Sequence, residues 1–210
     1  MLARLLSKNG FDLGPLKDRN YESRLYSWEI LNFQNFLLGT WDNPYTMYRD
    51  TESENYLVAK DKFIRQVKLK YNIHKLTAPH KNIAWKHPVA SLLLPELSEI
   101  SNTKFIRITR NKDDVIKSLS KRKLHSRVSL FPGRYGAGVN LHKTQNSERL
   151  VRFYENELNK YSSHFDLSLN YDRILDPSTR VIELEKLSGT LGIKSLNIPK
   201  HFFDDRTNKS

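Results

Sequence analysis

Residues 104–118, KFIRITRNKDDVIKS, decide the fold of this chain. The first six residues alternate and are rich in side chains that favour β-structure, which predicts a strand over 104–109. Asn111 is a good N-cap, and the carboxylates of Asp113 and Asp114 favour the positive end of a helix. The segment therefore predicts a strand that leads directly into a helix.

Strands and long helices alternate on both sides of this segment. Further strands are predicted over 83–86 and 167–171, where short runs rich in apolar residues lead into polar or turn residues. Helices are predicted over 2–9, about 26–38, 52–71, roughly 146–161 and 177–191. Strands separated by helices imply crossover connections. We therefore predict one α/β domain over residues 1–210, a three-layer sandwich with a mainly parallel sheet.

The composition is that of a globular protein with an excess of positive charge. The chain has 210 residues, of which 38% are hydrophobic, and a net charge of +12. The charge favours anionic partners such as nucleotides, sulfated or phosphorylated substrates, nucleic acid or acidic lipid. A basic solvated surface would give the same composition. There is no cysteine, which excludes disulfides and thiolate metal sites.

We expect no targeting or membrane-spanning segment. No apolar run approaches the roughly 20 residues that span a bilayer. The opening MLARLL is followed by Ser7, Lys8 and Asn9, so we interpret it as part of the fold rather than as a signal peptide. These features predict a soluble, cytoplasmic protein.

Two basic residues, Lys86 and Arg110, end predicted strands. In parallel sheets, ligands bind outside the carboxyl ends of the strands. An arginine at a strand end offers a bidentate fork to a phosphate, and the hydroxyl of Ser118 on the adjacent helix can donate to the same group. The sequence thus predicts an anion site at Arg110 and Ser118.

The pattern R-N-x-x-D-V-x-x-S, from Arg110 to Ser118, resembles the 3′-phosphate-binding motif of sulfotransferases that use 3′-phosphoadenosine 5′-phosphosulfate (PAPS). The resemblance implies that Arg110 and Ser118 bind the 3′-phosphate of this co-substrate. It also implies a fold like that of the P-loop-containing nucleotide hydrolases. Segments before and after the motif resemble the bacterial-type family in the same order, among them EILNFQNFLLGTWDNP, AWKHP and LNYDRILDPSTRVIELEKLSGTLGI.

The chain departs from this family at its start. Family members begin with a strand and a Gly-rich loop whose N–H groups hold the 5′-phosphosulfate, whereas Met1 falls where the following helix begins. The cluster GRYGAG at 133–138 follows the wrong elements to replace that loop. We therefore expect an N-terminally incomplete domain that lacks the first strand and loop. A gap or a substitute strand is then expected between 83–86 and 104–109.

Sulfuryl transfer needs a cationic clamp and a base for the acceptor hydroxyl or amine. Lys86 is the candidate clamp. His87 is the nearest candidate base, although cytosolic family members place the histidine two residues after the lysine. Other branches use a carboxylate, for which Glu22 or Glu29 is a candidate. The histidines lack metal-ligand spacing, so no metal is expected.

Two other interpretations remain open. The missing loop favours a non-catalytic module with a sulfotransferase-like fold that binds an anionic nucleotide or partner. The net charge and the aromatics beside basic residues in RVSLFPGRYG suggest a nucleic-acid-binding protein, but the sequence contains no known nucleic-acid module.

Overall fold

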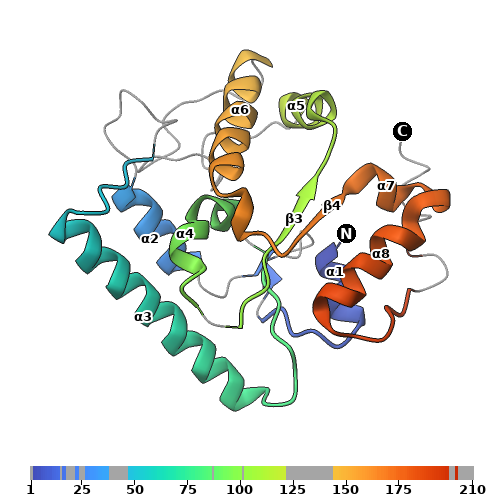
Figure 1. Cartoon of the computed structure of the whole chain (residues 1–210), viewed down its shortest axis with the longest axis horizontal. Coiled ribbons are helices and arrows are strands. Elements are labelled where there is room, and N and C mark those ends of the chain that lie inside the picture. The colour runs from blue at the N-terminus through green and yellow to red at the C-terminus, as the bar shows by residue number, and fades with distance from the viewer. Residues whose placement is uncertain are drawn as a thin grey trace.

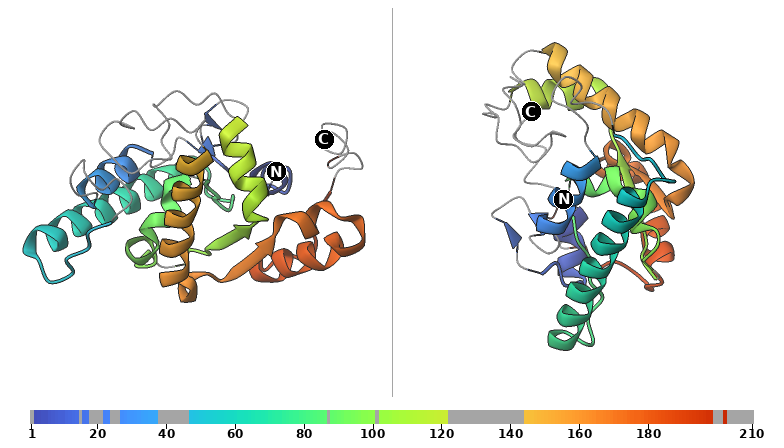
Figure 2. Two further views of the ribbon diagram at one scale, coloured as in Figure 1. Left: turned by 90° about the horizontal axis from the view of Figure 1, so that it is seen from above. Right: turned by 90° about the vertical axis from the view of Figure 1, so that its left-hand side faces the viewer.

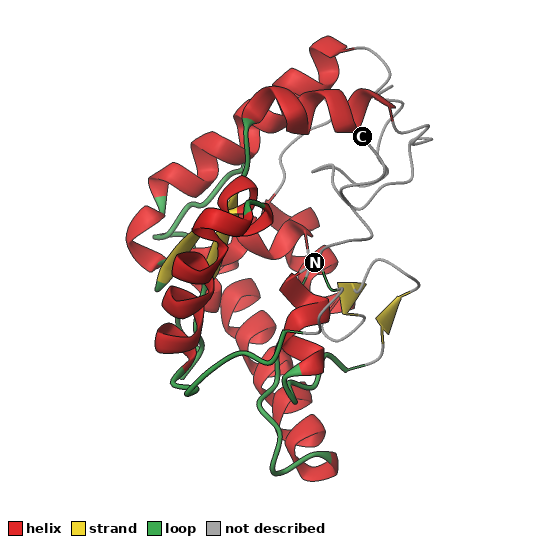
Figure 3. Cartoon of the chain, turned by 90° about the vertical axis from the view of Figure 1, so that its right-hand side faces the viewer, coloured by secondary structure: helices red, strands yellow, loops and turns green. Residues whose placement is uncertain are grey.

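The computed structural model describes residues 2–14, 16–17, 22–23, 27–37, 47–86, 88–100, 102–121, 144–198 and 202. Across these ranges the protein is mainly helical, and the helices surround a small sheet (Figure 1, Figure 3). It is therefore a mixed helix and sheet structure, as the alternation of strands and helices predicts.

Two of the predicted strands form a parallel pair. Strand β3 (Ile106–Thr109) pairs with β4 (Leu167–Asn170), with Ile106 opposite Leu167 and Thr109 opposite Asn170. Helices α5 and α6 lie between the two strands in the sequence. The predicted strands over 104–109 and 167–171, and their parallel direction, are thus confirmed.

The predicted strand over 83–86 is wrong. Ile83 forms only an isolated parallel bridge with Asp12, in the loop after the first helix. Trp85 packs against a core made by helices, so this short apolar segment serves a different part of the molecule. Within the described ranges, no backbone pairing joins residues 83–86 to β3, so the predicted gap or substitute strand between them stays a prediction.

The β3–β4 sheet has one apolar face and one polar face. Ile106, Leu167 and Leu169 pack into a core with α1 (Leu2–Lys8), α7 (Tyr171–Leu175) and α8 (Pro177–Leu191). On the other face, the Arg107 side chain reaches α6 and donates to Asn159 Oδ1 at 3.2 Å. The sheet therefore contributes apolar side chains mainly to the core beside α1 and α8.

A larger core lies among the remaining helices. It joins α2 (Ser27–Leu37), α3 (Glu54–Thr77), the 3₁₀ helix η2 (Pro88–Leu93), α4 (Leu94–Leu97) and α6 (Thr144–Lys160). Phe33 and Phe63 stack at its centre, with ring centroids 4.6 Å apart. On α3, Tyr56, Phe63 and Val67 are buried, whereas Tyr71 is exposed.

Three further elements complete the described structure. Helix α5 (Lys112–Lys121) packs on α6 and buries Ile116 and Leu119 there. Two short strands, β1 (Leu16–Lys17) and β2 (Glu22–Ser23), pair antiparallel, and the 3₁₀ helix η3 (Ser162–His164) precedes β4. Helices α3 and α8 lie at opposite ends of the molecule (Figure 2).

Segments distant in sequence meet beside α1. Asn9 Nδ2 donates to the Asn197 carbonyl at 3.0 Å, and the Asn197 N–H donates to Asn9 Oδ1 at 2.5 Å. Leu5 belongs to the same buried apolar core as Leu169 of β4, Ile174 of α7 and Leu187 of α8. The first helix is therefore held by segments from the C-terminal part of the chain.

Candidate functional site

Arg110 lies at the carboxyl end of β3, in the two-residue junction before α5. Asn111 follows it and caps the helix, because its Oδ1 accepts the N–H groups of Asp113 at 2.9 Å and Asp114 at 3.4 Å. Asp113 and Asp114 occupy the first turn, where their charges favour the helix dipole. The predicted strand, cap and helix are confirmed.

Strand β4 ends in the same way. Asn170 Oδ1 accepts the N–H groups of Asp172 at 2.9 Å and Arg173 at 3.1 Å, and so caps α7. Asp172 Oδ2 also accepts the Asn111 N–H at 3.2 Å. The two strand–helix junctions are therefore tied together at the carboxyl end of the sheet.

Arg110 is positioned between these junctions. Its Nη2 lies 3.8 Å from Asp114 Oδ2, and its Nε lies 3.9 Å from Asp172 Oδ1. Its guanidinium carbon lies 5.0 Å from the centre of the Tyr171 ring. Both carboxylates are beyond hydrogen-bond distance, and 38% of the Arg110 side chain is exposed. The guanidinium is thus oriented by two charges and a ring, and remains accessible to a solute anion.

Ser118 lies further along α5 and is half-buried. It is four residues after Asp114, one turn away and about 6 Å along the helix axis, so both side chains share one face of α5. Asp114 is the residue of this face that approaches Arg110. Ser118 therefore lies one turn beyond the α5 residue that approaches Arg110, and their joint binding of a phosphate stays a prediction.

The carboxyl end of β4 is hydrogen-bonded to a buried carboxylate, that of Glu183. Glu183 Oε2 accepts the Asn170 N–H at 3.0 Å, and Glu183 Oε1 lies 2.9 Å from Lys186 Nζ and 3.6 Å from Arg173 Nε. The hydrogen bond from the Asn170 N–H is the main reason why the pKa of Glu183 lies below its ordinary value; burial opposes the shift, and Lys186 and Arg173 add to it. This glutamate fixes the strand end from which α7 begins.

The structure says less about the predicted catalytic residues Lys86, His87 and Glu22 than about Arg110. Lys86 is exposed, but it does not end a strand of the β3–β4 sheet, because 83–86 is not part of that sheet. His87 lies outside the described residues. Glu22 belongs to β2, and its side chain is also outside what the structure describes. The roles of these three residues remain predictions.

Glu29, the other candidate carboxylate, is buried on α2. Its Oε1 lies 2.7 Å from Lys70 Nζ on α3, and its buried Oε2 has no hydrogen-bond partner among the residues that the structure describes. The pair lies among the helices of the larger core, on the other side of the molecule from α7 and α8 (Figure 1). Its described ionic partner is therefore Lys70.

The sequence interpretation missed Tyr171 and Asp172, the two α7 residues beside Arg110. A signal was present: LSLNYD at 167–172 repeats the order of a strand, an asparagine cap and an early acidic residue seen in 106–114. The sequence-based prediction extends the strand through Tyr171 and gives no helix there.

Within the ranges that the structure describes, no group of three or more His, Cys, Asp or Glu side chains is arranged to hold a metal ion. The described helices also include none that is long and apolar enough to cross a membrane. Searches against known protein families, curated proteins and solved structures found no match to this chain.

Proposed function

We propose that this protein binds PAPS through Arg110 and Ser118 and is a sulfotransferase-type domain. The observation that carries the proposal is the junction between β3 and α5. There, Arg110 ends a parallel strand, Asn111 caps the next helix, and Ser118 lies on the helix face that Asp114 turns toward Arg110. This order of groups is the one that the resemblance requires for a 3′-phosphate.

The exposed part of the Arg110 guanidinium can donate to a phosphate. A phosphate oxygen accepts from a guanidinium at about 2.7–2.9 Å, which is shorter than either carboxylate contact of Arg110. The Tyr171 ring already restrains the guanidinium, so less side-chain freedom is lost on binding. Asp114 and Asp172 oppose an anion, so the phosphate has to displace their long contacts with Arg110.

The proposed fold is a three-layer sandwich of the P-loop nucleotide hydrolase type. The parallel β3–β4 pair, with long helices between its strands in the sequence, supports it. In this arrangement the nucleotide would lie at the carboxyl end of the sheet, where both capped helices begin.

For the transfer itself, we propose that Lys86 is the cationic clamp and that His87 or Glu22 accepts the acceptor proton. The acceptor oxygen or nitrogen would form a bond to sulfur as the bond between sulfur and the 5′-phosphate oxygen breaks. The nucleotide product is 3′,5′-diphosphoadenosine. Lys86 would stabilise negative charge on the leaving phosphate.

Calorimetric titration with 3′,5′-diphosphoadenosine, and with 5′-AMP as the ligand that lacks the 3′-phosphate, tests the binding proposal. Arg110→Ala should weaken binding of the diphosphate by tenfold to more than a hundredfold, since a charge-assisted hydrogen bond contributes about 1.5–3 kcal/mol. Ser118→Ala should weaken it less, because it removes one neutral donor. Neither variant should change the affinity for 5′-AMP.

Two matched variants act as controls. Arg107→Ala removes an arginine from the same strand, and Ser120→Ala removes a serine from the same helix whose hydroxyl donates to the Ile116 carbonyl. Both should bind the diphosphate as the wild type does. Equal wild-type affinity for the two nucleotides, or no loss with Arg110→Ala, would reject the 3′-phosphate site.

A non-catalytic protein is the second candidate, because Lys86 does not end a strand of the β3–β4 sheet. Release of 3′,5′-diphosphoadenosine from PAPS, measured with a phenol, a sugar and a lipid alcohol as acceptors, distinguishes the two. Release that is lost with Lys86→Ala supports transfer. Tight binding of PAPS without release supports a nucleotide-binding protein that performs no transfer.

A further inference from the structure

The outward face of α3 carries three exposed aliphatic side chains in its C-terminal half. Leu69, Ile73 and Leu76 are 61%, 53% and 82% exposed. Their spacing of four and three residues puts them on one line along the helix. We call these three residues the α3 stripe.

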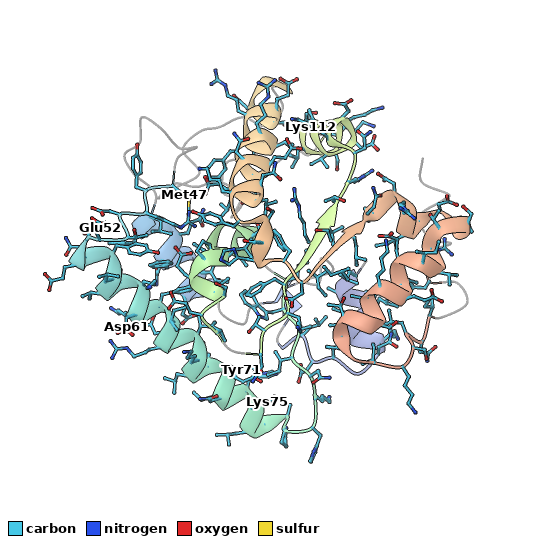
Figure 4. The ribbon with its side chains drawn as sticks, in the orientation of Figure 1. Met47, Glu52, Asp61, Tyr71, Lys75 and Lys112 are labelled. Atoms are coloured by element: carbon cyan, nitrogen blue, oxygen red, sulfur yellow. The ribbon has the colours of Figure 1, made fainter. Side chains whose placement is uncertain are left out.

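The α3 stripe points away from the core. The inward line of the same helix contains Tyr56, Phe63 and Val67, all buried. Helix α3 runs along the edge of the molecule, and its C-terminal end, where Tyr71 and Lys75 are labelled in Figure 4, projects beyond the neighbouring elements (Figure 1, Figure 2). A flat surface could therefore reach the stripe without a clash.

The Lys, Arg, Asp and Glu side chains near the stripe in the sequence are all basic. Residues 62–81 contain six lysines or arginines and no aspartate or glutamate: Lys62, Arg65, Lys68, Lys70, Lys75 and Lys81. Arg65 pairs with Asp61, and Lys70 pairs with Glu29. The other four make no ion pair within the described part of the chain. An apolar line flanked by unpaired cations is complementary to a surface that is both apolar and anionic.

We infer that α3, from Lys62 to its C-terminal end, docks the protein on an anionic lipid bilayer. The α3 stripe enters the boundary between headgroups and acyl chains, and Lys62 and Lys68 lie against anionic headgroups. The inference is independent of the proposed nucleotide site, because α3 contributes no residue to the Arg110 junction.

The side chains of the stripe favour a bilayer over nucleic acid. Single-stranded nucleic acids are bound by aromatic rings on which bases stack, whereas Leu69, Ile73 and Leu76 are aliphatic. Transfer of aliphatic side chains from water into hydrocarbon is favourable, in proportion to the apolar area removed from water.

Vesicle sedimentation of the full chain tests the inference. Vesicles of phosphatidylcholine with 30% phosphatidylserine should bind the protein, pure phosphatidylcholine should bind it weakly, and salt should reduce binding to the anionic vesicles. Leu69→Gln/Ile73→Gln/Leu76→Gln should lower the partition coefficient at least tenfold. Lys62→Gln/Lys68→Gln should lower it about 25-fold, since each lysine near an anionic surface contributes about 1 kcal/mol, or about fivefold.

Matched variants elsewhere on the surface control for net charge and hydrophobicity. Val181→Gln/Ile182→Gln/Ile198→Gln removes three exposed aliphatic residues from the other end of the molecule. Lys121→Gln/Lys194→Gln removes two exposed lysines outside α3. Both variants should retain most of the wild-type binding, and thermal melts should show that every variant is folded.

A site-specific probe separates insertion from adsorption by charge. Because the chain has no cysteine, Leu76→Cys and Val181→Cys each provide one position for an environment-sensitive fluorophore. Anionic vesicles should shift the emission of the label at position 76 to the blue and leave the label at position 181 unchanged. No binding, binding that the stripe substitutions leave unchanged, or equal shifts at both positions would overturn the inference. Binding to a single-stranded oligonucleotide but not to vesicles would overturn it in favour of nucleic acid.

Discussion

Arg49 Nε lies 2.7 Å from Glu96 Oε1, and both side chains are buried. The same guanidinium lies 3.2 Å from Glu157 Oε2 and donates to the Leu92 carbonyl. Tyr56 donates to Glu96 Oε1 at 3.0 Å. One arginine thus joins α4, α6 and η2 beside the larger core. Burial lowers the pKa of Arg49, but the charge and hydrogen bond of Glu96 outweigh this effect, and the net shift is upward.

Arg49→Met should destabilise the protein by about 3–5 kcal/mol, because it leaves the Glu96 charge buried without its cation. Denaturant unfolding measures this change. Arg65→Met is the matched control: its pair with Asp61 is exposed, so the expected change is below about 1 kcal/mol.

The double variant Arg49→Met/Glu96→Leu tests the cause. Removing both charges should restore part of the stability that Arg49→Met loses, since Glu157 keeps Lys160 at 2.5 Å. A double variant as unstable as the sum of its single changes would show that packing, rather than charge, decides the effect.

Glu183 gives the protein a predictable acid response. Its pKa in the folded state lies below the ordinary 4.5, mainly because the Asn170 N–H donates to it. A lowered pKa stabilises the fold above pH 4.5, and this contribution is lost as the pH falls below that value. Glu183→Gln should lower the free energy of unfolding by about 1–2 kcal/mol at pH 7. Between pH 5 and pH 3, the variant should lose less of its stability than the wild type does. Unfolding curves at several pH values check both points; parallel losses would exclude Glu183 as the source.

The two glycines of α8 should respond in opposite directions to alanine. Gly189 lies within the helix with no atom near the position of an added Cβ, so Gly189→Ala should stabilise by about 0.5–1 kcal/mol. Gly192 ends the helix at φ +67°, where alanine is strained, so Gly192→Ala should destabilise by about 1 kcal/mol. A shift of both melting temperatures in the same direction would contradict this assignment.

Asn170 should contribute more to the stability of the fold than Asn156, which lies inside a helix. Asn170→Ala removes the cap of α7 and should cost about 0.5–2 kcal/mol. Asn156→Ala, at an exposed site inside α6, should be neutral or slightly stabilising because alanine has the higher helix propensity. Thermal denaturation measures both variants. Equal effects on the melting temperature would contradict the prediction.

Local signals in the sequence were sufficient for most helices and for two strands. Asn111, Asp176 and Gly192 act at the predicted helix ends, because caps and left-handed stops depend on neighbouring backbone groups alone. The alternation in 104–109 predicted β3 because one face of that strand meets a core.

The failures have a non-local cause. The apolar run at 83–86 has the composition of a strand, but its partner is Asp12 and its tryptophan packs on helices, which only the tertiary structure decides. The Arg49–Glu96 pair joins residues 47 positions apart, and neither has a local signal that predicts burial. At the candidate site, Arg110 and Ser118 could be singled out from one segment, whereas Tyr171 and Asp172 come from another strand.

The packing of α1 also has a consequence during synthesis. Asn9 meets Asn197, 188 residues later in the chain, and Leu5 is buried in a core that includes residues of β4, α7 and α8. At about 5–20 residues per second, roughly 10–40 s pass on the ribosome before that partner exists. Helix α2, in contrast, packs on α3, which directly follows it among the described helices. The apolar side of α1 is therefore open to ribosome-associated chaperones for most of translation, while the α2–α3 pair can already form.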